Sequence, residues 1–193
     1  RLKDTLMKAK EQKKVFLFLL AFFFYIDGVY TIIDMATAYG TSLGLNTTGL
    51  LLALLLTQIV AFPASLTFAV LSKTKDTASL IKVAIIAYFL IALFAVQLDK
   101  QWEFWVLAVA VGCFQGGIQA LSRSYFAKII PENASGEYFG LFDICGKGAS
   151  FLGTMLMGVV TQITGKQNLG VAALSIMFVI GYLIFNKVSK MDD

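Results

Sequence analysis

Six long apolar runs, separated by short polar connections, organise the sequence. Each run is long enough to form the helix of roughly 20 residues that crosses a hydrocarbon core of about 30 Å. The pattern therefore predicts an all-α integral membrane protein with a six-helix bundle. The predicted spans are residues 15–39, 49–71, 80–97, 104–122, 136–163 and 168–186.

The fifth run, residues 136–163, carries charged residues inside an otherwise apolar segment. At about 100° per residue, its small and polar residues share one helical face. These residues are Gly136, Gly140, Asp143, Gly146, Lys147, Ser150, Thr154, Gly158 and Thr161. An ionisable side chain near the bilayer centre is costly, so we expect Lys147 to face a polar cavity or a partner. The glycines of this face are interpreted as a surface for close helix packing.

Polar residues also share one helical face in the first span and in the fourth. In the first span these residues are Asp27, Tyr30, Thr31 and Asp34. In the fourth they are Gln115 and Gln119, followed at the end of the span by Arg123. The second span has a weaker polar face. The third and sixth spans have almost no polar residues, which predicts that these two spans face lipid. This three-helix period predicts two three-helix repeats, and the odd number of spans in each makes them inverted relative to one another.

The composition agrees with a membrane protein: 58% of the residues are hydrophobic and only 15% are charged, against about a quarter in soluble domains. Most of the 16 Lys and Arg residues lie in the terminal segments and in the second and fourth connections. Because cytoplasmic loops hold the basic excess, both termini are predicted to be cytoplasmic. Residues 1–14 are then a basic cytoplasmic linker and residues 187–193 a cytoplasmic tail. This distribution leaves no basic surface that would suggest nucleic-acid binding.

The residue types that usually carry enzyme chemistry are scarce. The sequence has no histidine, and its two cysteines lie inside apolar runs, so we expect free thiols, no metal site and no cofactor. It also lacks the GxSxG and HExxH motifs, which argues against an intramembrane enzyme. The sequence begins with Arg1 and shows no signal peptide, and we expect it to be cut from a longer chain.

Two stretches resemble a known family. They are FFFYIDGVYTIIDMATAYG at residues 22–40 and GGIQALSRSYFAKIIPENASGEYFGLFDICGK at residues 116–147. Both are similar to the carboxy-terminal half of the vacuole-effluxer-like, autophagy-related permeases of the major facilitator superfamily. The resemblance implies half of a twelve-helix fold, with an amino-terminal six-helix bundle as the missing partner and the third helix of each triplet on the periphery. It also implies transport, since fungal members are associated with export of amino acids from the vacuole.

The leading interpretation is half of a secondary active transporter that moves a small polar solute, for example an amino acid, by alternating access coupled to protons. The alternative is a self-assembling six-helix membrane protein or channel. We expect a multi-pass protein in the plasma membrane of a bacterium. The substrate or proton-coupling residues are predicted to be Asp27, Tyr30, Thr31, Asp34, Gln115, Gln119, Asp143 and Lys147. For Arg123 we expect gating or cytoplasmic anchoring.

Depth along the helices predicts one specific contact. Asp27 lies about 18 Å from the start of its span and Lys147 about 15 Å from the start of its own, at 1.5 Å per residue. Both spans enter from the same side, so the two charges are expected to pair across the cavity near the midplane. Asp143 has two candidate partners, Lys147 one turn later and Arg123. Asp34 is interpreted either as a solvated acid near the outer surface or as a site residue.

Overall fold

The computed structural model describes residues 2–191, which form helices joined by short connections. The helices are α1 (Leu2–Glu11), α2 (Lys13–Ser42), α3 (Thr47–Thr74), α4 (Thr77–Val96), α5 (Gln101–Ile129), α6 (Ser135–Lys147), α7 (Phe151–Thr164) and α8 (Gln167–Ser189), with a short 3₁₀ helix η1 (Glu132–Ala134) before α6. Six candidate membrane spans are present, the fifth of which combines η1, α6 and α7. The predicted all-helical fold with six spans is confirmed.

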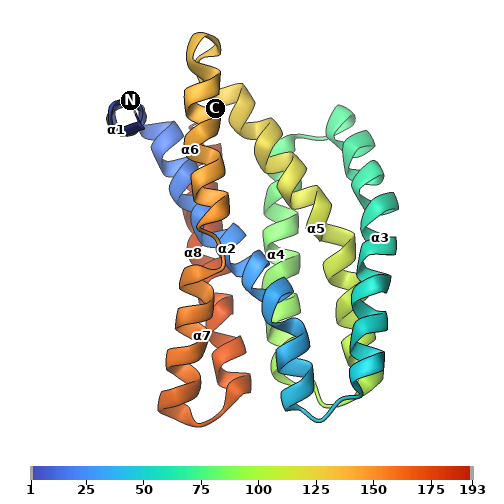
Figure 1. Cartoon of the computed structure of the whole chain (residues 1–193). Helices are drawn as coiled ribbons and strands as arrows, with labels where there is room; N and C mark the ends of the chain where they lie inside the picture. The colour runs from blue at the N-terminus through green and yellow to red at the C-terminus, as the bar shows by residue number, and fades with distance from the viewer. Residues whose placement is uncertain (1, 192–193) are drawn as a thin grey trace.

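The six spans form one bundle in which α2 runs diagonally across the others (Figure 1). α3 packs along α5, α4 packs between α5 and α8, and α2 contacts α8, α5, α6 and α7. Both chain ends lie at the same end of the bundle as the α3–α4 and α5–α6 connections (Figure 1). The basic residues concentrated in these segments therefore lie together at that end.

Buried aromatic rings hold α2, α5 and α8 together near the termini. Phe18 of α2 lies 5.3 Å from Tyr125, 5.5 Å from Phe126 and 6.1 Å from Phe185, measured between ring centroids. Aromatic rings at such separations stabilise beyond the area that they bury. The hydroxyl of Tyr25 also lies 2.6 Å from that of Ser122, which links α2 to α5 inside this core.

Local signals set the ends of several helices. The side chain of Asn46 accepts a hydrogen bond from the Gly49 amide at the start of α3, and Asp76 does the same for Ser79 at the start of α4. These are N-caps, which satisfy amides that the helix itself leaves free. Gly165 ends α7 in the left-handed conformation that glycine adopts at little cost.

Apolar side chains cover much of the outside of the bundle. α4 and α8, the predicted bare spans, pack on each other and keep exposed apolar residues on their outer sides. Those of α4 include Val83, Ile86 and Leu90, and those of α8 include Ile176, Val179 and Leu183. This arrangement agrees with two helices at a lipid-facing rim. α3 also exposes a long row of apolar side chains, including Leu55, Ile59, Phe62, Leu66 and Val70. More of its surface is therefore apolar and exposed than the polar residues of the second span suggested.

Candidate functional site

A polar groove between α2, α5 and α6 brings together five of the residues that the sequence singles out. They are Tyr30, Gln119, Arg123, Asp143 and Lys147. The groove has a volume of about 650 Å³, enough for a small solute, and its remaining lining comes from aromatic and small residues. Two cationic side chains, one carboxylate, one amide and one phenol therefore line a single hollow on an otherwise apolar bundle.

Arg123 and Asp143 form an ion pair at the groove, with 3.3 Å between Nη1 and Oδ1. The guanidinium also lies over the rings of Phe139 and Phe142, 4.8 and 5.8 Å from their centroids. Both charged side chains are about half exposed, so solvent weakens their attraction. The aromatic faces orient the guanidinium nonetheless. Of the two partners predicted for Asp143, Arg123 is therefore the one with which it pairs in the structure.

Lys147 lies exposed in the last turn of α6, at the rim of the groove. A cation is favourable there because the carbonyl groups at a helix C-terminus carry partial negative charge. Over residues 2–191, Lys147 takes part in no ion pair. Its ammonium group is therefore available to a ligand that enters the groove. It also borders a shallower hollow over Ser150, Phe151 and Thr154.

Asp27 is completely buried, and its carboxylate contacts backbone rather than Lys147. Oδ1 accepts a hydrogen bond of 2.7 Å from the Gly153 amide, and Oδ2 accepts one of 3.2 Å from the Leu152 amide. These two amides belong to the first turn of α7, so Asp27 caps that helix from a neighbouring one. The predicted ion pair between Asp27 and Lys147 is wrong. The Asp27 carboxylate binds amides at the start of α7, whereas Lys147 lies in the last turn of α6.

The fifth span is broken at that point, and the prediction of one continuous helix over residues 136–163 is wrong. α6 ends at Lys147, and α7 begins at Phe151. Ser150, between them, has a φ of +78°, in the left-handed region that non-glycine residues seldom adopt. The single polar face drawn along the whole span therefore applies only within each half, because the break resets the helical register.

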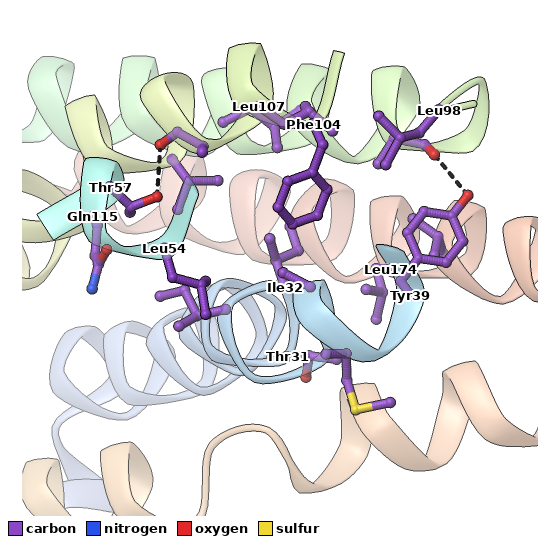
Figure 2. A pocket seen from close by; sticks show the side chains of 18 of the residues that line it. Thr31, Ile32, Tyr39, Leu54, Thr57, Leu98, Phe104, Leu107, Gln115 and Leu174 are labelled. Atoms are coloured by element: carbon purple, nitrogen blue, oxygen red, sulfur yellow. Dashed lines mark hydrogen bonds between the residues drawn. The ribbon is translucent and has the colours of Figure 1, made fainter. Parts of the chain in front are cut away.

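Thr31 and Gln115 lie away from the groove, around an apolar cavity inside the bundle (Figure 2). This cavity has a volume of about 90 Å³. Tyr39 and Thr57 line it too, and their hydroxyls donate to the carbonyl oxygens of Ala95 and Ala108. Asp34 is exposed on α2 and borders neither this cavity nor the groove. The predicted site residues therefore divide between two places, and only the groove has a mixture of charges.

Four glycines of the fifth span face open space within the described part of the chain. Around Gly136, Gly140, Gly146 and Gly158, no other heavy atom would lie within 4 Å of an added Cβ. Within residues 2–191 these four glycines therefore pack against no other helix. Their interpretation as a packing surface stays a prediction about a partner outside this chain. Gly153 is the opposite case, since a Cβ added there would collide with the side chains of Asp27 and Thr31.

Some parts of the site were not apparent from the sequence. Phe139 and Phe142 flank Arg123, and the backbone amides of Leu152 and Gly153 bind Asp27. The one available signal was the Gly-Lys-Gly at residues 146–148, a weak helical stretch in the middle of an apolar span.

Comparison with known proteins decides the family. The family model described as "Vacuole effluxer Atg22 like" matches residues 1–191. The chain belongs to the Atg22-like family. This confirms the resemblance inferred from residues 22–40 and 116–147.

Bacterial and fungal proteins are similar to this Atg22-like chain. The MFS-type transporter YxiO of Bacillus subtilis is 45% identical over 184 residues, which cover 95% of this chain and 43% of YxiO. Autophagy-related protein 22 of Yarrowia lipolytica is 30% identical over 170 residues, covering 83% of this chain and 29% of that protein. Autophagy-related protein 22-1 of Aspergillus niger is 26% identical over 178 residues, covering 84% and 29% respectively. The Atg22-like chain thus spans less than half the length of these relatives.

Proposed function

We propose that this chain is the carboxy-terminal half of a secondary active transporter that moves a small polar solute by alternating access. The observation that carries the proposal is the polar groove of Tyr30, Gln119, Arg123, Asp143 and Lys147 on the side of an apolar bundle. Charged groups facing hydrocarbon are costly, so this flank requires a polar cavity and a covering partner.

The proposed partner is an amino-terminal six-helix bundle of the same transporter. Two observations support it. The chain spans 43% of the MFS-type transporter YxiO. The open glycine face of Gly136, Gly140, Gly146 and Gly158 would let another helix approach closely. The solute would then bind between the two bundles, with this groove as one wall.

The groove supports a solute with both charge signs. Lys147 and Arg123 can bind a carboxylate, Asp143 can bind an ammonium group, and Gln119 and Tyr30 can bind neutral polar atoms. An amino acid has this chemistry, and we propose it as the substrate class. We further propose proton coupling through Asp27, the one acidic side chain that lies fully buried in the described residues.

The proposed setting is the plasma membrane of a bacterium, with both termini cytoplasmic. Single cysteines at Asn46, Lys100 and Lys166, in a background without Cys113 and Cys145, are expected to react with an impermeant thiol reagent added outside intact cells. A cysteine at Lys75 is expected to react only after permeabilisation, because it lies in a basic connection at the end that holds both termini. The reverse labelling pattern would reject this orientation.

Transport by the full-length parent in proteoliposomes tests the function. Uptake of a panel of amino acids and other small polar solutes, with and without a pH gradient, is expected to identify a transported zwitterion. Gln119→Leu removes a hydrogen-bonding group from the groove and is expected to lower uptake about ten-fold. Gln97→Leu, which makes the same change at the exposed end of α4, is the matched control and should transport normally.

Two outcomes would contradict the proposal. One is uptake that Gln119→Leu leaves unchanged, since the groove would then not be the solute path. The other is a functional assembly made of two copies of this chain alone, which would favour the self-assembling protein or channel.

A further inference from the structure

We infer that Asp27 is a positioning residue: its carboxylate holds the break between α6 and α7 and thereby sets the place of Lys147 at the groove. The capping contacts stand on geometry alone. The consequence for solute binding rests on the proposed function, because it requires Lys147 to contact the solute. This role differs from a direct ion pair, in which Asp27 would neutralise Lys147.

Both oxygens of the Asp27 carboxylate are used at the break. One accepts the Gly153 amide at 2.7 Å and the other accepts the Leu152 amide at 3.2 Å. The Thr31 hydroxyl donates to the Asp27 carbonyl at 2.8 Å and lies 3.4 Å from Oδ1 and 3.5 Å from the Ser150 carbonyl oxygen. Two side chains one turn apart on α2 therefore contact the backbone of the break at Ser150, Leu152 and Gly153.

The break exists because these contacts replace what a continuous helix would supply. In an unbroken span, the amides of Leu152 and Gly153 would bond to the carbonyl groups four residues earlier. With Ser150 in the left-handed conformation, those bonds are absent and the amides need another acceptor. Asp27 is that acceptor, and its negative charge suits the partial positive charge at the start of α7.

On the other side of the break, at the end of α6, a positive charge takes the place of the negative one. α6 ends with Lys147, whose positive charge suits the carbonyl groups that terminate that helix. Since only Gly148, Ala149 and Ser150 separate the two helices, a change at the start of α7 is transmitted directly to the end of α6. Lys147 borders the groove from this position.

This arrangement requires the ionised carboxylate. Protonation removes the negative charge and makes one of the two oxygens a weaker acceptor that also carries an O–H donor, so the hydrogen bonds to the two amides weaken. The charged or titratable side chains nearest this point along the surrounding elements include Tyr25, Tyr30 and Asp34 on α2, Tyr88 on α4, Arg123 on α5, Asp143, Cys145 and Lys147 on α6, and Tyr182 on α8, while α7 carries none. Within residues 2–191, none of them bonds to the Asp27 carboxylate. Proton uptake by Asp27 therefore loosens the break and frees Lys147 to shift.

Hydrogen exchange of the full-length parent in lipid nanodiscs, followed by mass spectrometry, tests the capping role. Asp27→Asn and Asp27→Ala are expected to speed exchange of the amides at 148–154 by about ten-fold, as loss of an N-cap acceptor predicts. Exchange in α3 and α5 should stay unchanged. Asp76→Ala is the matched control for Asp27→Ala, since it removes a capping aspartate at the start of α4 and should affect that helix end alone.

Exchange at 148–154 that is unchanged in the Asp27 variants would overturn the inference. An equal increase in all helices would overturn it too, because Asp27 would then be a general packing residue. If Asp27→Ala does not insert, Asp27→Asn carries the test, since it occupies the same volume.

Transport separates this inference from the proposed function. In solute exchange without a pH gradient, Asp27→Asn is expected to raise KM in the same direction as Lys147→Ala, and the double variant should be no worse than Lys147→Ala alone. Additive effects would show that Asp27 does not act through Lys147. A parent that transports no solute of the panel but shows the local change in exchange would remove the proposed function and leave the capping role standing.

Discussion

Replacing Gly153 by alanine is expected to destabilise the bundle by about 1–3 kcal/mol, as overpacking does. A Cβ at this position would lie 2.8 Å from Oδ1 of Asp27 and would contact Oγ1 of Thr31 even more closely. Neither side chain has space to withdraw, because both are completely buried. The variant therefore has to separate α7 from α2 or give up the amide contacts of Asp27. A lower apparent melting temperature of the purified protein in detergent would measure the effect.

Gly158→Ala is the matched control for this experiment. Gly158 lies in the same helix, and no other heavy atom would lie within 4 Å of its added Cβ. Alanine in a helix is favoured over glycine by about 1 kcal/mol, so this control is expected to be neutral or more stable. Equal melting temperatures for the two variants would show that the contact between α2 and the start of α7 is not tight.

Replacing Lys147 by alanine in the full-length parent is expected to raise the KM for solute by about 10–100-fold, the range for loss of a hydrogen bond to a charged group. The reason is that Lys147 borders the groove and has no ion-pair partner among residues 2–191. Lys147→Arg should retain part of the affinity, since it keeps the charge with a different shape. Initial rates of uptake at varied solute concentration would measure both variants.

Lys166→Ala is the control for lost positive charge, because Lys166 lies exposed beyond the opposite end of α7. It should leave KM unchanged. A normal KM in Lys147→Ala would remove this side chain from the binding surface. The groove would then have to recognise the solute through Arg123, Gln119 and Tyr30 instead.

The residues of the groove could be predicted from the sequence because the evidence for them is local. Tyr30, Gln119 and Asp143 each lie in a helix that continues unbroken around them, so the spacing within one span correctly assigns their face. Their meeting in one hollow follows from the convergence of polar helices, which the three-helix period indicated.

The break in the fifth span could not be predicted in the same way. Its cause, Asp27, lies 126 residues earlier than Gly153, and no local rule connects the two. Locally, Lys147 to Ser150 reads as a poor but possible helix, because glycine weakens a helix without ending it. Depth did place Asp27 and Lys147 near the same level. Depth did not reveal that the two side chains would each lie at the end of a helix and would not pair with one another.

The glycines of the fifth span show what helical spacing alone leaves undetermined. Their spacing correctly places Gly136 and Gly140 on one side of α6, but packing requires a partner that spacing does not identify. Because the space beside them inside this chain is open, the packing prediction can apply only to a partner outside it. The same reasoning explains why Asp34 remained ambiguous, since its exposure depends on what surrounds α2.

The divided fifth span also constrains how the protein enters the membrane during synthesis. α6 has 13 residues and α7 has 14, so each rises only about 20 Å and is too short to cross about 30 Å of hydrocarbon alone. The fifth span is also the least apolar of the six candidate spans, which makes it a weak signal for the insertion machinery. The first span carries Asp27 and is made more than a hundred residues earlier. We therefore expect Asp27 to be in the bilayer before the fifth span leaves the ribosome, and the insertion of the fifth span to depend on a helix made long before it.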